Sequence, residues 1–236
     1  MDATREKVYL AALLHDIGKF YQRADKPFSD KGNHLSNESY QITDHLCPLN
    51  ENGGFGYQHT VWTHQFLQDN EQVMKEIPDL VDNVFDNGKE DSIFQLASYH
   101  HKPSTELQSL ISMADWWSAG IDRRENNLEE ENGKANGITW GNQRYKKIPL
   151  YSVFNKIFNA NHHSAFGLKS LSIDENGFFP TDITKAEDGN DESKYVLLWQ
   201  NFEDEFKKLP TDTFNGFTES LISLLKKYTW CIPSNT

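Results

Sequence analysis

Residues 5–24 read REKVYLAALLHDIGKFYQRA, and this stretch decides the interpretation of the chain. Apolar residues occur on all sides of the segment, and Pro27 follows shortly after its end. Both features are typical of a buried helix that closes ahead of a proline. The sequence therefore predicts one helix over 5–24, with the pair His15-Asp16 in its middle.

The pair and its neighbours have the composition of a metal and phosphate site. On a helix, His15 and Lys19 lie one turn apart on one face, with Asp16 about 100° round. The imidazole nitrogen and the carboxylate oxygen can then meet one metal ion, while Lys19 reaches a phosphate oxygen. Ala11 and Ala12, one turn earlier, leave space for another helix or a substrate to approach.

Three more ionisable residues occur at helical spacing on faces that are otherwise apolar: His59, His100 and Asp115. A buried histidine or aspartate without a partner is unfavourable, so each of these side chains calls for one. A divalent metal ion is such a partner. Imidazole nitrogens mixed with carboxylate oxygens suit Mn, Fe, Co, Ni or Zn. We expect a divalent transition metal, with Mn, Ni, Co and Fe as the candidates.

The histidine assignments have alternatives. His59 at the start of its helix faces solvent in a second interpretation, and His64 is then the ligand instead. Because His100 and His101 are adjacent, at most one of them is expected to bind a metal directly. The other supports the site from behind or is exposed.

Other residues are assigned to ordinary structural roles. Asp115 pairs with Arg123 or Arg124 in an alternative to metal binding. The pair Trp116-Trp117 is interpreted as core and interface packing rather than a base-stacking platform. Four histidines are expected to be solvated: His34, His45, His162 and His163.

The rest of the chain divides by pattern into helices, loops and short strands. A long polar, glycine-rich loop is predicted over 27–57. Amphipathic helices are predicted over 59–70, 91–101, 104–124 with Ser104 as N-cap, 193–209 and 211–230. In the last two, the buried positions are expected to be Val196, Trp199, Phe202, Phe206, Phe217, Leu221 and Leu224. Residues 125–141 and 186–193 form acidic loops, and 148–158 and 170–179 are predicted to pair as strands. We expect a core over 1–124, an acidic linker over 125–147 and an α+β segment over 148–236.

Charge and composition limit the functions. A net charge of −12 repels polyanions at long range, so a nucleic acid would need a local basic patch or partner subunits to approach. Acidic metal sites recruit cations that bind phosphate, so a nuclease is less disfavoured than a simple nucleic-acid binder. Cys47 and Cys231 form no C-x-x-C pair, so no zinc ribbon is suggested. No apolar run approaches the roughly 20 residues that span a bilayer, and we expect a cytoplasmic protein without membrane contact.

Four stretches resemble the large subunit of type III CRISPR effector complexes, the Csm type in particular. They are LAALLHDIGKFYQRA (10–24), SMADWWSAGIDRR (112–124), IPLYSVFNKI (148–157) and WCIPSNT (230–236). The first resembles the opening of that subunit and the second its aspartate-bearing helix. The resemblance implies a mainly α fold, a permuted HD-domain helical bundle with a small α+β segment in the C-terminal half. It also implies a metal-dependent nuclease that acts on single-stranded DNA.

The same resemblance implies roles for individual residues. The metal set that it carries over is His15, Asp16, His59, His100 and Asp115, of which His59 matches least closely. Asp16 and Lys19 are the implied catalytic residues, with Lys19 contacting phosphate. The implied partners are the single-stranded DNA substrate, the other effector subunits and the guide RNA.

Members of that family continue beyond the Pro-Ser-Asn-Thr turn in ways that these 236 residues do not. They carry a further helix, palm domains with a Gly-Gly-Asp-Asp motif that make cyclic oligoadenylates, and a cysteine-ligated zinc element. We therefore expect this chain to correspond to the N-terminal portion. Two other functions stay open: an HD phosphohydrolase acting on nucleotides, and a scaffold or partner-binding domain with weak catalysis.

Overall fold

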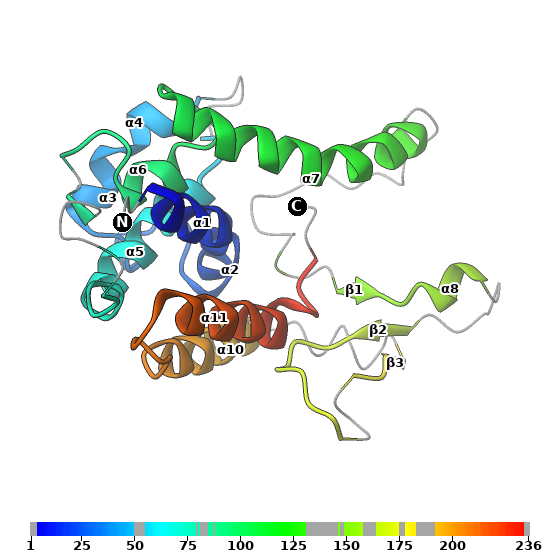
Figure 1. Cartoon of the computed structure of the whole chain (residues 1–236). Helices are drawn as coiled ribbons and strands as arrows, with labels where there is room; N and C mark the ends of the chain where they lie inside the picture. The colour runs from blue at the N-terminus through cyan, green and yellow to red at the C-terminus, as the bar shows by residue number, and fades with distance from the viewer. Residues whose placement is uncertain are drawn as a thin grey trace. The chain divides into compact units, whose positions relative to one another are not determined.

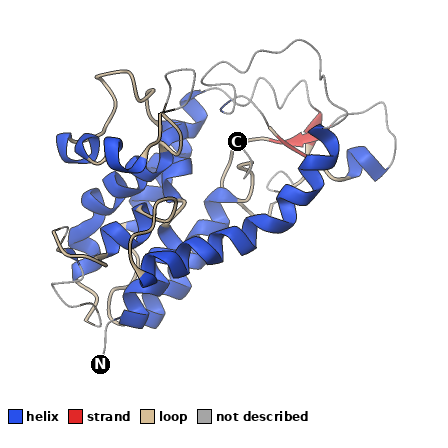
Figure 2. Ribbon diagram, turned by 90° about the horizontal axis from the view of Figure 1, so that it is seen from above, coloured by secondary structure: helices blue, strands red, loops and turns tan. Residues whose placement is uncertain are grey.

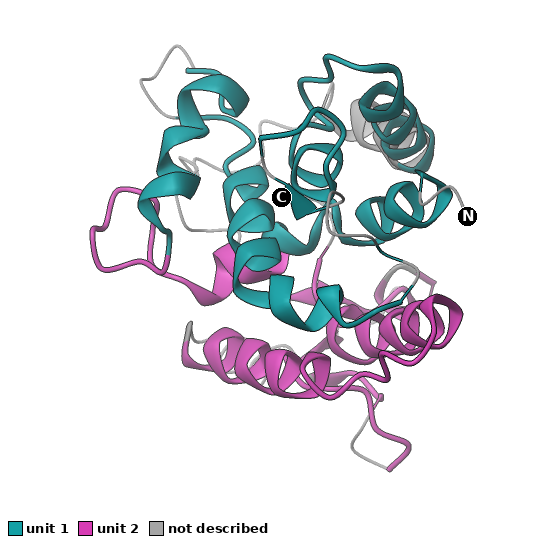
Figure 3. Ribbon diagram, turned by 60° about the vertical axis from the view of Figure 1, so that its left-hand side comes forward, with its two compact units in different colours: residues 1–19, 35–141 teal, residues 20–34, 142–236 magenta. Residues whose placement is uncertain are grey.

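The computed structural model describes residues 4–49, 55–78, 80, 85–86, 88–130, 146, 149–157, 164–174, 178–182 and 192–233. These residues are mainly helical, with one small antiparallel sheet (Figure 2), so the predicted fold class is confirmed. No helix in the described ranges is both long and apolar enough to cross a membrane. The chain forms two compact units, residues 1–19 with 35–141 and residues 20–34 with 142–236 (Figure 3).

The first unit is a helical cluster centred on a short helix, α6 (Ile93–Ser98), which packs against three others. These are α1 (Thr4–Leu14), α5 (His59–Lys75) and α7 (Glu106–Glu130), labelled in Figure 1. Two short helices, α3 (Asn37–Gln41) and α4 (Thr43–Leu46), pack on α5. Large apolar side chains fill the space between them: Leu10, Leu14, Val61, Trp62, Phe66, Leu67, Ile93, Leu96 and Ile111.

The predicted single helix over 5–24 is wrong in one respect, because it breaks at the pair His15-Asp16. The structure has α1 up to Leu14, a turn, and then α2 (Ile17–Ala24). A hydroxyl from α5 replaces the missing helical hydrogen bonds. Thr63 Oγ1 donates to the carbonyl of His15 at 2.8 Å and accepts from the backbone N–H of Gly18 at 3.1 Å. A single side chain thus holds both sides of the turn.

We expect Thr63→Val to destabilise the protein by about 2 kcal/mol, because it leaves the buried His15 carbonyl and Gly18 N–H without their partner. The free energy of unfolding from urea titration measures this. Thr43→Val is the matched control, since the Thr43 hydroxyl is buried and has no hydrogen-bond partner in the described structure. That control should be neutral or stabilising, and equal losses in both variants would contradict the role of Thr63.

Other boundaries in the first unit also differ from prediction. The predicted loop over 27–57 contains α3 and α4, the first of which begins at the N-cap Ser36. The helix over 91–101 ends earlier, at Ser98, and its start is capped by Ser92. The cap of α7 is Thr105 rather than Ser104, because Thr105 Oγ1 accepts from the N–H of Gln108. The α7 helix also continues to Glu130, into the stretch predicted as an acidic linker.

The second unit combines two amphipathic helices with a three-stranded sheet. The helices α10 (Glu192–Phe206) and α11 (Phe214–Thr229) confirm the prediction and pack on each other. Aromatic rings from α2 join their core. Tyr21 stacks on Trp199 at 4.3 Å between centroids, and Phe20 meets the same ring edge-on at 5.0 Å. Of the predicted core residues, Val196 is wrong, since it is 37% exposed while Tyr195 is buried.

The sheet forms from other residues than predicted. Its strands are β1 (Leu150–Tyr151), β2 (Ser164–Phe166) and β3 (Thr181–Asp182), in the order β1-β2-β3 and antiparallel throughout. In the described part of 148–158, residues 149–157, β1 is the only strand, because the chain then turns into α8 (Phe154–Ile157). The Asn155 amide nitrogen donates to the carbonyl of Ser164, and its amide oxygen accepts from the N–H of Ser164. These two hydrogen bonds join α8 to β2. In the described part of 170–179 there is no strand.

Two further side chains lie elsewhere than expected. Trp116 and Trp117 are 59% and 76% exposed, so the predicted packing in a core is wrong, while packing at an interface stays a prediction. Their position on the outer side of α7 explains this, because Ile111 and Ser112 occupy the buried side of that helix. Predicted loop residues 186–191, and His162 and His163, lie outside the described residues.

Candidate metal centre

The turn between α1 and α2 brings His15 and Asp16 to the side of α7. His15 Nε2 lies 3.4 Å from Asp16 Oδ2 and 3.5 Å from Asp115 Oδ1. On the other ring nitrogen, His15 Nδ1 donates to the carbonyl of Ala12 at 2.8 Å. This hydrogen bond fixes the ring and leaves Nε2 facing the carboxylates.

Two further histidines reach the same aspartate from other elements. His59 Nε2, at the start of α5, lies 3.4 Å from Asp16 Oδ1, and His100 Nε2 lies 3.8 Å from it. His100 is fully buried, and its Nδ1 donates to the carbonyl of Ala97 at 2.7 Å, the same arrangement as His15 and Ala12. Of the five predicted ligands, His15, His59 and His100 thus meet around the Asp16 carboxylate, and Asp115 contacts His15.

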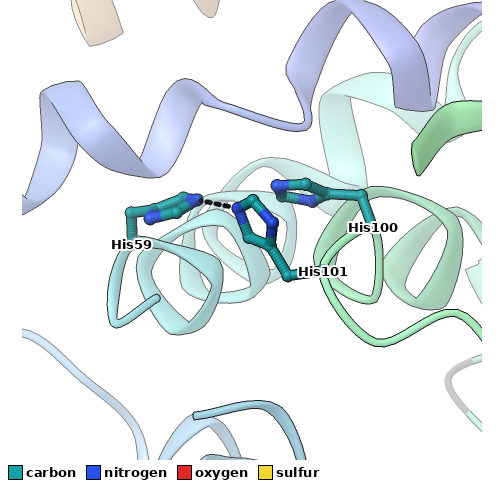
Figure 4. Close-up of side chains that lie close together, drawn as sticks. All are labelled: His59, His100 and His101. Carbon is teal, nitrogen blue, oxygen red and sulfur yellow. Dashed lines mark hydrogen bonds between the residues drawn. The ribbon is translucent and has the colours of Figure 1, made fainter. Parts of the chain in front are cut away.

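The structure adds a sixth residue, His101, where the sequence predicted that at most one of His100 and His101 binds a metal directly. Its Nε2 lies 3.2 Å from His59 Nε2, with His100 beside them (Figure 4). Adjacent histidines normally diverge on a helix, but α6 ends at Ser98 and both imidazoles reach the site from the following turn. If the sequence had predicted the end of this helix before His100, both imidazoles could have been expected at the site.

These residues form two groups of potential ligands that share His100. One group is His15, Asp16 and His100, and the other is His59, His100 and His101. In each group the donor atoms all lie within 4.8 Å of one another. Such spacing matches what one divalent ion requires of three donors.

Unpaired atoms support the fit of a metal to the first group. His15 Nε2, Asp16 Oδ1 and His100 Nε2 are buried and make no hydrogen bond, and their ion-pair contacts with neighbouring carboxylates and imidazoles are long, at 3.4 to 3.8 Å. Leaving one buried polar atom unpaired is unfavourable by about 1–3 kcal/mol, and three such atoms pointing at one place are rare in a folded protein. Imidazole nitrogens and carboxylate oxygens bind divalent transition metal ions, so these three side chains suit the metal ion that the sequence predicts.

The remaining side chains separate into partners and bystanders. Lys19 Nζ donates to Asp16 Oδ2 at 2.7 Å. The side chain that was predicted to contact phosphate is therefore bound to the Asp16 carboxylate. His64 is buried away from the group, where its Nδ1 pairs with Ser39 Oγ at 3.0 Å, and this favours His59 as the donor. His34 and His45 are exposed, as predicted.

Charge in the cluster moves the pKa values in opposite directions. Burial lowers the pKa of His15, but pairing with Asp115 and Asp16 outweighs it and raises that pKa to about 10. Burial raises the pKa of Asp16, but pairing with His15 and the nearby cations lowers it below the ordinary value. Burial, with repulsion from neighbouring imidazoles, lowers the pKa of His100 to about 3 and also lowers that of His59. His15 therefore carries a proton in the metal-free protein, while His59 and His100 are neutral and can each offer a nitrogen lone pair to a metal ion.

Comparison with known families agrees with this geometry. A model of the HD domain matches residues 1–131, more than half of the chain. The chain belongs to the HD-domain family. Its candidate metal centre, from His15 to Asp115, lies entirely within the matched residues.

This HD-domain protein is also similar to a characterised relative. It is 30% identical over 237 residues to a CRISPR system single-strand-specific deoxyribonuclease, Cas10/Csm1 of subtype III-A, from Methanocaldococcus jannaschii. The alignment covers 96% of this chain and 23% of the relative, so the HD-domain protein spans about a quarter of it. No solved structure matches the chain. Together the two matches confirm the resemblance drawn from the four sequence motifs.

We expect the metal-free HD-domain protein to be most stable near pH 6.5, the ordinary pKa of histidine. Above that pH the folded state alone keeps the His15 proton, so stability falls as pH rises towards about 10. Below pH 6.5, His59 and His100 become protonated in the unfolded chain but stay neutral in the folded protein. The free energy of unfolding therefore falls as pH drops towards about 3. Thermal unfolding in EDTA across this range measures the maximum.

The variant His15→Gln is the control for the alkaline side of this profile, because it has no proton to lose there. Its melting temperature should no longer fall above pH 6.5, and the fall on the acid side should become shallower, because His15 no longer opposes protonation of His100. Added Mn²⁺ should stabilise the wild type more as pH rises, since the ion competes with the proton on His15. A wild-type melting temperature that rises steadily above pH 6.5 in EDTA would contradict the pairing of His15 with the carboxylates.

Proposed function

We propose that this chain is a metal-dependent HD nuclease that hydrolyses phosphodiester bonds of single-stranded DNA in type III CRISPR defence. The observation that carries the proposal is the convergence of three buried, unpaired donor atoms, from His15, Asp16 and His100, inside an HD domain. The substrate is taken from the relative, whose name states single-strand-specific deoxyribonuclease activity.

The proposed metal ligands are His15, Asp16, His59, His100 and Asp115, with His101 completing the second donor group. Asp16 would bridge the two groups if both are filled, because its Oδ1 lies near His59 and His100 while its Oδ2 lies near His15. The proposed ion is Mn, Ni, Co or Fe, since all accept this mixture of imidazole and carboxylate.

A divalent ion at this site would polarise the scissile phosphate and activate water towards it. The chain's own residues have separate tasks. The hydrogen bonds of His15 and His100 to backbone carbonyls hold their rings in one orientation. Lys19, now paired with Asp16, offers the cation that offsets charge building on the phosphate. Asp115 holds His15 from the α7 side.

We further propose that the chain works with other effector subunits and guide RNA in the cytoplasm, as the relative's assignment to subtype III-A suggests. A charge of −12 agrees with the need for partners, because the chain alone repels DNA at long range. The division into a core over 1–124, a linker over 125–147 and an α+β segment over 148–236 stays a prediction.

The decisive experiment measures metal and products on the same preparation. Metal content by mass spectrometry is followed by incubation with Mn²⁺ and three substrates: single-stranded DNA, the same DNA as a duplex, and deoxynucleoside triphosphates. We expect bound metal and shortened single strands, with the duplex largely intact. Released phosphate from nucleotides with intact DNA would favour a nucleotide phosphohydrolase instead. Absence of both metal and cleavage would favour a scaffold.

A further inference from the structure

Tyr57 has an unusual backbone for its residue type. It lies two residues before His59 and has a φ of 51°, in the left-handed region. A residue with a β-carbon loses roughly 1–2 kcal/mol there, and such strain persists only where the surrounding structure enforces it. Strained residues cluster at functional sites, so a strained residue beside a candidate metal centre requires an explanation.

Hydrogen bonds fix this conformation from both sides. The Tyr57 carbonyl accepts from the backbone N–H of Thr60 at 3.0 Å and from its hydroxyl at 2.9 Å, and the Cys47 thiol donates to it at 3.7 Å. Ahead of it, the Gly56 N–H donates to the carbonyl of Pro48 at 2.8 Å. Each of these bonds holds the backbone, so they restrict where the ring can go.

The strain does not bury the ring, since Tyr57 is 48% exposed. What it achieves is a stack. The Tyr57 ring lies 4.0 Å from the His101 ring, with 19° between the planes, and it meets the His59 ring edge-on at 6.5 Å. An aromatic ring has two faces. His101 covers one face, and in the part of the chain that the structure describes no other ring stacks on the opposite face, which lies next to the candidate metal ligands.

We propose that the open face of Tyr57 stacks an unpaired nucleobase of the strand whose phosphate lies at the metal centre. This inference rests on the proposed function and names how that site recognises its substrate. Base stacking on an aromatic side chain contributes about 1–3 kcal/mol per base and tolerates any sequence, because every base has a π face. A base in a duplex has both faces covered by its neighbours, so the platform selects single strands.

The platform also answers the charge problem of this chain. Its −12 charge opposes binding of a polyanion, and Lys19 is already paired with Asp16. Stacking is not an attraction between net charges, so it adds affinity where long-range attraction is missing. The His101 ring behind Tyr57 keeps the platform rigid, which lowers the entropy lost when a base binds.

The test compares Tyr57→Phe, which keeps the ring, with Tyr57→Leu, which removes it. Tyr57→Asn is a second ring-free variant, since asparagine tolerates the left-handed region and covers the case in which the leucine variant misfolds. Tyr151→Leu is the matched control, because Tyr151 is 49% exposed and lies on β1. Dissociation constants are measured by fluorescence anisotropy with Mn²⁺, using a cleavage-resistant phosphorothioate oligothymidine and an abasic oligomer of the same backbone.

We expect the wild type, Tyr57→Phe and Tyr151→Leu to bind oligothymidine equally, and the ring-free variants to bind it about tenfold more weakly. The abasic oligomer should bind all of them alike, because it has no base to stack. Metal content should be unchanged in every variant.

Four results would overturn the platform. They are an unchanged dissociation constant in Tyr57→Leu and Tyr57→Asn, an equal weakening towards the abasic oligomer, no binding of oligothymidine by the wild type, and loss of metal from the ring-free variants. Loss of metal would mean that the Tyr57 ring holds His101 in position and does not stack a base. Wild-type metal content and cleavage test the proposed nuclease independently, so either idea can fail alone.

Discussion

Under the proposed function, we expect replacement of Asp16 with asparagine to remove bound metal and to lower metal-stimulated cleavage of single-stranded DNA by roughly 100-fold or more. The variant keeps the shape of the side chain but loses the negative charge on which His15, His59 and His100 converge. A neutral amide oxygen is a much weaker donor for a transition ion, and the amide nitrogen introduced at this position would face the histidine lone pairs. Metal content and initial cleavage rates are measured on the same protein.

Asp44→Asn is the matched control for this prediction. Asp44 is exposed on α4, and the same change there should leave metal content and cleavage within about twofold of the wild type. Circular dichroism separates loss of the site from loss of the fold. Full metal occupancy in the Asp16 variant would rule out the donor group centred on this carboxylate, and the other group, His59, His100 and His101, would then be the candidate.

Gly18→Ala will destabilise the protein by about 3–5 kcal/mol, the larger end of single substitutions. A β-carbon at Gly18 would lie 1.9 Å from the carbonyl oxygen of His59 and 2.5 Å from the backbone nitrogen of Thr63. Both are backbone atoms of α5 and cannot rotate away. Alanine gains about 1 kcal/mol in helix propensity over glycine, and the overlap exceeds that gain. Urea unfolding measures the loss.

Gly167→Ala is the control for the glycine substitution, because nothing lies within 4 Å of a β-carbon built there. Its free energy of unfolding should change by about 0.5 kcal/mol or less. Gly18→Ala should also weaken metal binding, since α5 must move away and takes His59 with it. A stable Gly18→Ala variant with normal metal content would show that α2 and α5 do not approach as closely as described.

The sequence predicted which side chains come together but not the path of the chain through them. The family resemblance implied the set His15, Asp16, His59, His100 and Asp115, and periodicity placed the last three on apolar faces. That they bind a metal stays a prediction. The break at His15-Asp16 was missed because the local signal is a lone glycine, Gly18, and a single glycine inside a helical pattern is often tolerated. Its cause is the Thr63 hydroxyl, which is 48 residues away in the sequence. Local propensity cannot register a hydrogen bond from another helix.

His101 and the sheet were missed for similar reasons. Helical geometry spreads adjacent side chains apart, so the pair at 100–101 was expected to supply one ligand, whereas the early end of α6 lets both imidazoles converge. In the C-terminal half, the short run 150–151 could pair with any neighbouring apolar stretch. The hydrogen bonds of the Asn155 side chain to Ser164 favour β2 as the partner strand of β1. A pattern of apolar residues cannot predict this pairing.

The turn at His15-Asp16 gathers donor atoms from distant parts of the chain. The donor atoms come from the turn after α1, from the start of α5, from the residues after α6 and from α7, between positions 15 and 115. An ion bound to all of them would be a cross-link that closes loops of several tens of residues, and closing such loops removes entropy from the unfolded chain. No single segment carries all the donor atoms, so a fragment of residues 5–24 should bind the ion about as weakly as a mixture of imidazole and acetate.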